Sequence, residues 1–258
     1  MLLRTEPSFI LIAPKFKIIS GRQLFCRGGP FKERSDRVKA ILFEAFETQA
    51  KPSLDRSTDF FVAIQDSLRA DGGCLDTFYG FLNVIAKAPK FDSSAVDPKA
   101  APWATLFEAL QAWDGWGKKT AAILVKSLYQ IHNDKANKAV RFWDDAPPLS
   151  RSDTIYVPID SVIIHIFSKH FDARLNNFGK INAYLLETKY KEPEDLLIWD
   201  DLWFWGFITQ KGGGDGRKTT AWNNSKYWSI RDVPKESEAI GEIRERAKAF
   251  SRILGRAK

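Results

Sequence analysis

Apolar residues recur at helical spacing through the first half of the chain. In residues 36–49 the positions Val38, Ile41, Leu42 and Phe46 are apolar, and this spacing of three or four residues is typical of one buried helix face. The same pattern predicts a helix that begins at a cap from Ser57 or Thr58 and ends at Gly72-Gly73, another over residues 75–86, and another over residues 103–110.

The pattern continues after residue 117. It predicts helices with these spans: 118–128, 161–170, 179–190, 193–209 and 236–254, the last of them basic and amphipathic. Residues 1–35 are rich in Pro and Gly and predict irregular chain, and residues 132–156 are polar, contain Pro147-Pro148 and have no clean period, which we interpret as a surface insertion. Since no strand alternation is sustained, we expect an all-α fold.

Composition limits the classes of protein to consider. The 258 residues are 44% hydrophobic, so the chain can bury a core, and the net charge of +7 with a pI near 9.3 suits a polyanionic partner. Only two cysteines are present, Cys26 and Cys74, so this chain cannot itself supply a four-cysteine iron–sulfur cluster or zinc site, and we expect no such cofactor. No apolar run approaches the ~18 residues that span a bilayer. We therefore expect an intracellular, cytoplasmic protein without a membrane partner.

Residues 110–128 carry the most specific signal. An apolar helix end runs into Gly115-Trp116-Gly117, and Lys118-Lys119-Thr120 then opens an amphipathic helix. Glycines permit a tight turn with backbone angles that other residues avoid, and the free N–H groups at a helix start attract an anion such as phosphate. The segment therefore predicts a helix-hairpin-helix that binds the DNA backbone. The predicted contacts come from Gly115, Trp116, Gly117, Lys118 and Thr120.

Two motifs together resemble a known family. Leu-x-x-Trp-x-Gly-x-Gly-Lys-Lys-Thr-Ala at 110–121 and Val-Pro-Ile-Asp-Ser-Val at 157–162 resemble the signature of the helix-hairpin-helix DNA glycosylases, which include endonuclease III and the 8-oxoguanine DNA glycosylases. The resemblance implies two helical halves with a DNA cleft between them. We expect one half to comprise residues 1–49 and 156–258, and the other, with the hairpin, residues 50–155.

The resemblance also implies roles for residues. Lys119 matches the family's catalytic lysine and Asp160 its catalytic aspartate, although 41 residues separate them, more than is usual in the family. Hairpins of this family often hold a monovalent cation on main-chain carbonyls, which here would be those of Gln111, Trp113 and Trp116. The implied partner is double-stranded DNA with a damaged or modified base, possible substrates including 8-oxoguanine, and the implied assembly is a monomer.

Each residue also has a simpler interpretation. Lys119 alone would be an ordinary solvated lysine, Asp160 alone would be the N-cap of the helix that follows it, and Trp116 would either pack inward or lie against DNA. The expected function is a glycosylase that also cleaves abasic DNA through a lysine Schiff base. The alternatives are a DNA-binding protein without catalysis and a monofunctional glycosylase in which Asp160 activates water.

Overall fold

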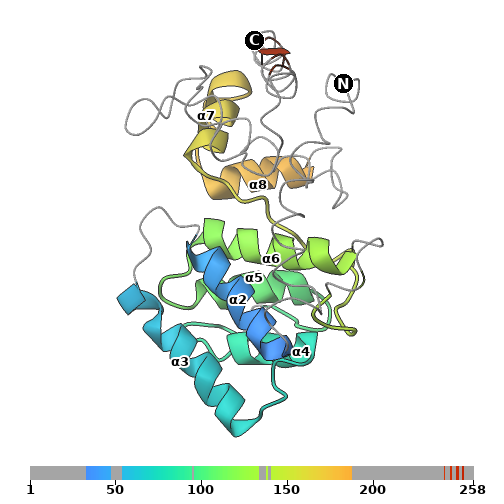
Figure 1. Cartoon of the computed structure of the whole chain (residues 1–258). Helices are drawn as coiled ribbons and strands as arrows, with labels where there is room; N and C mark the ends of the chain where they lie inside the picture. The colour runs from blue at the N-terminus through green and yellow to red at the C-terminus, as the bar shows by residue number, and fades with distance from the viewer. Residues whose placement is uncertain are drawn as a thin grey trace. The chain divides into compact units, whose positions relative to one another are not determined.

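The computed structural model describes residues 33–47, 54–94, 96–133, 138, 141–187, 241, 245, 248, 249 and 252. These residues form helices and connecting segments without any strand, which confirms the predicted all-α class. The helices are labelled in Figure 1 as α2 (Arg34–Glu47), α3 (Leu54–Ala70), α4 (Phe78–Ile85), α5 (Pro102–Gln111), α6 (Lys118–Asn133), α7 (Ser161–His170) and α8 (Phe178–Glu187).

Two predicted helices fall largely beyond this part of the chain. The one over 193–209 lies outside the described residues, and of the one over 236–254 only five positions are described, all of them helical. Among the helices that the structure describes, none has the length and apolar character needed to cross a membrane.

The described residues divide into two compact units at Pro158. Residues 33–158, here called the hairpin unit, contain α2 to α6, and the residues from Ile159 onward form the second unit with α7 and α8. The sequence predicts that helix α2 lies in the other half, with residues 1–49. It belongs to the hairpin unit because its buried face, which includes Val38 and Leu42, packs against α6.

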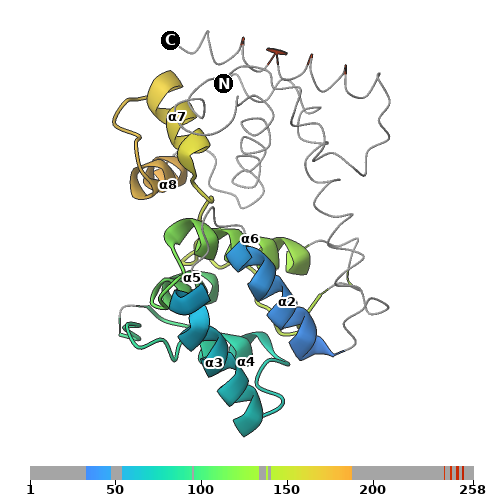
Figure 2. The ribbon, with the colours of Figure 1, turned by 60° about the vertical axis from the view of Figure 1, so that its left-hand side comes forward.

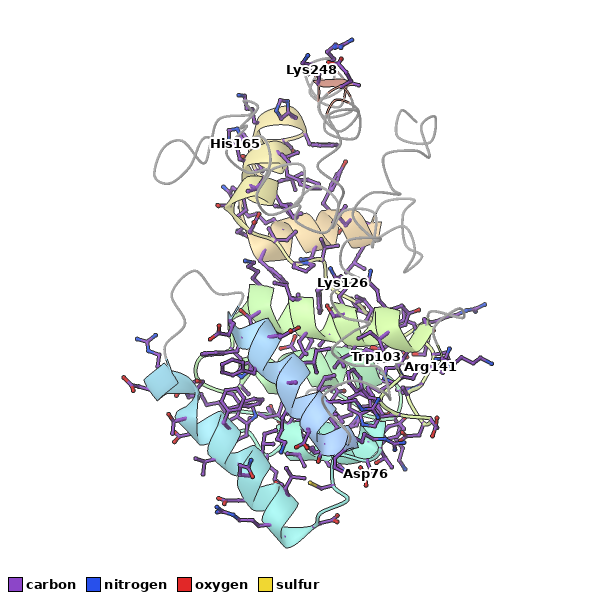
Figure 3. The ribbon with its side chains drawn as sticks, in the orientation of Figure 1. Asp76, Trp103, Lys126, Arg141, His165 and Lys248 are labelled. Atoms are coloured by element: carbon purple, nitrogen blue, oxygen red, sulfur yellow. The ribbon has the colours of Figure 1, made fainter. Side chains whose placement is uncertain are left out.

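Helix contacts in the hairpin unit link its five helices in a chain. α5 packs on α6, α2 lies across α6, α4 packs on α5, and α3 on α4 (Figures 1 and 2). Trp103 of α5 is completely buried within this unit (Figure 3). The interior of the hairpin unit is formed by side chains from all five helices, among them Phe46, Ile64, Phe78, Phe81, Leu82, Leu106, Leu110, Leu124 and Leu128.

Residues 141–158, here called the strap, are an integral part of this core. Phe142 and Trp143 are almost fully buried, and the Trp143 indole donates a hydrogen bond to the carbonyl of Leu75 at 2.8 Å. The Trp103 indole in turn donates to the carbonyl of Pro147 at 3.0 Å. The prediction of a surface insertion is therefore wrong for this segment, because an extended chain can bury single aromatic residues without any helical period.

The strap also caps two helices. Asp145 accepts hydrogen bonds from the amides of Phe78 and Tyr79 at 2.8 and 3.4 Å, which adds to the Thr77 N-cap of α4. Asp153 likewise accepts hydrogen bonds from the amides of Trp103 and Ala104 at the start of α5. The N-cap residue of this helix, Ala101, has no side-chain acceptor. A carboxylate at a helix start satisfies unpaired amides and complements the positive end of the helix dipole. Segments distant in sequence therefore fix where α4 and α5 begin.

Helix α3 begins earlier than its sequence pattern indicates. The sequence predicts a cap from Ser57 or Thr58, but the helix already includes Leu54, and Ser57 lies inside it, almost fully buried. The small Ser57 side chain faces Gly115 of the hairpin, where a methyl group added to the glycine would lie 3.4 Å from Ser57 Cβ. The predicted cap is therefore wrong, and the serine serves close packing.

The second unit pairs α7 with α8. Apolar residues of α7, including Ile163 and Ile166, are buried, as are Ile181 and Leu185 of α8. The two helices contact one another and are joined by the loop 171–177, whose Leu175 is also buried. The predicted span of α7 is confirmed, and α8 begins one residue before its predicted start and is described as far as Glu187.

Candidate functional site

The loop between α5 and α6 makes a tight hairpin. The chain leaves α5 through Ala112, the Trp113 amide donates to the Leu110 carbonyl at 3.1 Å, and the Trp116 amide donates to the Trp113 carbonyl at 3.3 Å. Gly115 has φ of 87°, and it is the only residue in the described part of the chain with a positive φ. Because side chains strongly disfavour this region, Gly115 is the glycine that the turn requires.

Gly117 has a different role from the one expected of it. Its φ is not positive, so the expectation that it also needs an unusual backbone angle is wrong. A methyl group built on Gly117 meets no protein atom within 4 Å. The space in front of the α6 N-terminus is therefore open, and a side chain there would extend toward whatever approaches the helix start.

Two tryptophans anchor the hairpin to the helices beneath it. The Trp116 ring lies 4.9 Å from the Phe60 ring and 6.2 Å from the Phe46 ring, and Trp113 meets Phe60 edge-on at 5.6 Å. The Trp113 indole also donates to the Ile85 carbonyl at 2.8 Å. Trp116 is buried, so of its two possible positions the inward one is found, and its side chain is not available to DNA. The ring contacts hold the turn on α2 and α3, and the indole hydrogen bond holds it on α4.

The start of α6 presents free amides. The first hydrogen bond of the helix joins the Ala121 amide to the Gly117 carbonyl at 3.0 Å, and no described residue accepts from the amides of Lys118, Lys119 or Thr120. Lys118 is exposed, Lys119 is half-buried, and the Thr120 side chain is buried. An anion placed here would meet amide donors, the positive end of the helix dipole and an ammonium group. Thr120 is also a predicted DNA contact, but its side chain is buried, which disfavours contact between its hydroxyl and a phosphate.

Carboxylates lie close to this basic turn. Burial raises the pKa of the Glu108 carboxyl, and the positive charge of Lys118 opposes that shift. The Gln111 amide donates to Glu108 at 3.3 Å, and Asp114 pairs with Lys90 at 2.6 Å across an exposed surface. Glu108 could not be identified from the sequence, because its proximity to Lys118 depends on the fold of the intervening turn. Part of the Lys118 charge is thus already balanced within the protein.

Asp160 is held rigidly at the start of α7. Its Oδ1 accepts hydrogen bonds from the amides of Val162 at 2.9 Å and Ile163 at 3.0 Å, which confirms its N-cap interpretation. No described residue donates to its other carboxylate oxygen. A cap of this kind fixes the carboxylate in place while leaving one oxygen for another partner. Asp160 belongs to the second unit and Lys119 to the hairpin unit, so their pairing stays a prediction.

Metal ligands of the usual kinds do not gather in the described residues. No group of three or more His, Cys, Asp or Glu side chains is placed there to hold a metal ion. The predicted cation would instead use the carbonyls of Gln111, at the end of α5, and of Trp113 and Trp116 in the hairpin loop. The Trp113 carbonyl already accepts the Trp116 amide, and it keeps a second lone pair for an ion. This cation site stays a prediction.

Comparison with known proteins gives no relative: no protein-family model, no curated protein and no solved structure matches this chain.

Proposed function

We propose that this chain is a DNA glycosylase that removes a damaged or modified base from double-stranded DNA and then cleaves the strand through a lysine Schiff base. The observation that carries the proposal is the hairpin 113–120. Its Gly115 has φ of 87°, and the turn presents the free amides of Lys118 and Lys119 at the start of α6. Such a turn suits a backbone phosphate, and it places Lys119 one residue into the helix.

Lys119 supplies the nucleophile in this proposal. The amine of Lys119 attacks C1′ of the target nucleotide, a new C–N bond forms, and the bond between C1′ and the base breaks. The departing base takes the electron pair of that bond and a proton. The sugar ring then opens to a Schiff base on Lys119, from which loss of a neighbouring proton expels the phosphate and cleaves the strand. The target nucleotide must leave the base stack first.

Asp160 stabilises the developing charge. Positive charge accumulates on the sugar as the base departs, and a fixed carboxylate lowers the energy of that state. The two amides that hold Oδ1 of Asp160 keep the group in one orientation, so little reorganisation is needed during the reaction. The second oxygen, without a donor in the described chain, is the one available to the sugar or to a proton.

Borohydride trapping tests the proposal. The full chain is incubated with duplexes that each carry one lesion, beginning with 8-oxoguanine, and borohydride then reduces any Schiff base to a stable adduct. We expect an adduct with the wild-type chain and with Lys118→Gln, which is the matched control, and none with Lys119→Gln. Base release without an adduct would indicate the monofunctional alternative. Binding without base release on any duplex of the panel would indicate a DNA-binding protein that lacks catalysis.

A further inference from the structure

Glu108 and Lys118 carry opposite charges on the two sides of the hairpin turn. Glu108 lies in the last turn of α5, which has no basic residue, and Lys118 is the first residue of α6, whose first turn has no acidic residue. The two helices pack against one another (Figures 1 and 2). An acidic group near a helix C-terminus and a basic group at a helix N-terminus each oppose the dipole of their own helix. Each charge therefore stands where its own helix disfavours it.

The fold lets these two charges compensate one another. Burial of part of the Glu108 side chain raises its pKa, and the positive charge of Lys118 acts against that rise, so the two groups lie close enough to interact. On the other side of Glu108 lies Tyr156 of the strap, whose pKa is raised by burial and then by the negative charges of Glu108 and Asp153. Tyr156 is therefore a neutral neighbour at physiological pH, and Lys118 is the cation that acts on Glu108.

The Glu108 carboxylate is held loosely. The Gln111 side-chain amide donates to Glu108 Oε2 at 3.3 Å and to the Phe107 carbonyl at 3.4 Å. Glu108 and Lys118 both remain exposed to solvent. Long hydrogen bonds between exposed groups are weak, and water replaces them at little cost. The carboxylate can therefore turn away from the hairpin without leaving a buried polar group unsatisfied.

We propose that the Glu108 carboxylate is an internal counter-ion of the hairpin, which competes with a DNA phosphate for the charge of Lys118. The start of α6 attracts an anion through its free amides and its dipole, and Glu108 already supplies negative charge beside it. A phosphate that arrives there must displace this carboxylate or approach it against the repulsion of like charges. The inference rests on the proposed DNA partner and adds to it a residue that sets affinity without taking part in the chemistry.

The position of Glu108 separates affinity from chemistry. Its charge acts on Lys118 and not on the proposed nucleophile, so Glu108 is a positioning residue. Glu108→Gln should therefore lower the dissociation constant for DNA and leave the single-turnover excision rate at saturating protein unchanged. The same carboxylate loses charge as the pH is lowered from 8 to 5, because burial raises its pKa. DNA affinity should accordingly rise more in the wild type than in Glu108→Gln over this range, and other titrating groups contribute equally to both proteins.

DNA binding by the full chain tests the inference. Dissociation constants are measured on an undamaged duplex across a salt series. We expect Glu108→Gln to bind about threefold more tightly than the wild type at low salt, with a salt dependence steeper by about one unit of slope, because Lys118 is then free to neutralise a phosphate. Glu108→Asp keeps the charge and should bind nearly as the wild type does. Asp144→Asn, which changes the net charge equally at a side chain 90% exposed beside Arg34, is the matched control and should change neither quantity.

A double-mutant cycle assigns the effect to Lys118. If Glu108 acts by competing for that ammonium group, Glu108→Gln should change DNA affinity by less than about 1.5-fold in a chain that already carries Lys118→Ala. Simple repulsion between Glu108 and DNA would instead persist in the Lys118→Ala background. Melting temperatures of all variants control for misfolding, and an exposed carboxylate should change them little.

The outcomes separate this inference from the proposed function. Binding by Glu108→Gln that equals or falls below that of the wild type, at an unchanged melting temperature, would overturn the counter-ion, as would a gain that persists without Lys118. Trapping on Lys119 could still succeed in either case. Tighter binding that depends on Lys118, without any trapping, would support the counter-ion and reject the glycosylase. A chain that binds no DNA, either as the wild type or as Glu108→Gln, would overturn both.

Discussion

Asp153 caps helix α5 by accepting the amide of Trp103, which lies fifty residues earlier in the chain. One carboxylate oxygen accepts from the Trp103 amide at 3.0 Å, and the other accepts from the amides of Ala104 at 2.8 Å and Thr154 at 2.9 Å. Ala101, the residue before α5, offers no side-chain cap. Burial raises the pKa of Asp153, and its three backbone donors oppose that shift. The first helix of the candidate hairpin therefore depends on the strap.

Replacing Asp153 should destabilise the hairpin unit. Asp153→Ala leaves the amides of Trp103 and Ala104 without an acceptor in a buried region, and we expect it to lower the free energy of unfolding by about 2–4 kcal/mol. Asp144→Ala is the matched control, since the Asp144 side chain is 90% exposed and lies 3.9 Å from Arg34, and it should cost less than about 0.5 kcal/mol. Urea unfolding of the two variants measures both. Equal stabilities would mean that the strap does not hold α5.

His132 should make stability depend on pH. Its ring lies parallel to Trp143 at 5.2 Å, and burial, aided by the Arg141 charge and opposed by Asp144 and Asp145, lowers its pKa from 6.5 to about 4. A histidine held neutral in the fold stabilises it above pH 6.5, and this stabilisation is lost as pH falls through about 4. The shift corresponds to about 3 kcal/mol.

The variant His132→Phe keeps the stacked ring but cannot titrate. We therefore expect the wild type to lose unfolding free energy relative to His132→Phe as the pH is lowered from 7 to 4. Carboxylates that titrate in the same range contribute to both proteins and cancel in the difference. Urea unfolding at several pH values measures it. A difference that stays constant across this range would show that His132 is already charged or solvated in the native state.

Helical periodicity predicted most of the described fold. The spans of α2, α5 and α7 follow from apolar residues three or four apart, and these helices bury the faces that the pattern indicates. The strap could not be predicted in this way, because Phe142 and Trp143 are buried from an extended chain. The capping of α5 by Asp153 could not be predicted either, because no local sequence pattern links Asp153 to Trp103.

The candidate site was predicted in outline only. The Gly-x-Gly motif located the turn, but the backbone decides which glycine takes a positive φ, and it is Gly115. Trp116 had two possible positions, and the inward one follows from the Phe60 and Phe46 rings contributed by α3 and α2. Lys119 and Asp160 belong to different units, so their joint role stays a prediction.

Asp160 variants should separate its capping role from its proposed catalytic one. Asp160→Asn keeps an oxygen for the amides of Val162 and Ile163, so its stability should change by less than about 0.5 kcal/mol, while excision should slow by about 100-fold or more. Asp160→Ala loses the cap as well and should cost about 1 kcal/mol. Thermal melting and single-turnover excision are measured together. If Asp160→Asn were as unstable as Asp160→Ala and retained excision in its folded fraction, Asp160 would be a cap alone.

The two hairpin glycines should behave differently when each is changed to alanine. Gly115→Ala places a side chain at φ of 87°, within 3.4 Å of Phe46 and Ser57, and we expect a loss of about 1–3 kcal/mol in unfolding free energy. Gly117→Ala meets only open space, so stability should be unchanged. Its added methyl group nevertheless stands where a phosphate would approach the α6 amides, so DNA affinity should fall.

Lys118→Ala completes the comparison, because it removes charge without changing the turn. Lys118 is exposed and partly balanced by Glu108, so its loss should weaken DNA binding less than Gly117→Ala does, and should flatten the salt dependence by about one unit of slope. Dissociation constants on an abasic-site duplex across a salt series measure both variants. If Lys118→Ala were the more damaging change and Gly117→Ala bound normally, residues 113–120 would act as a patch of positive charge, and the hairpin would no longer support the proposed glycosylase.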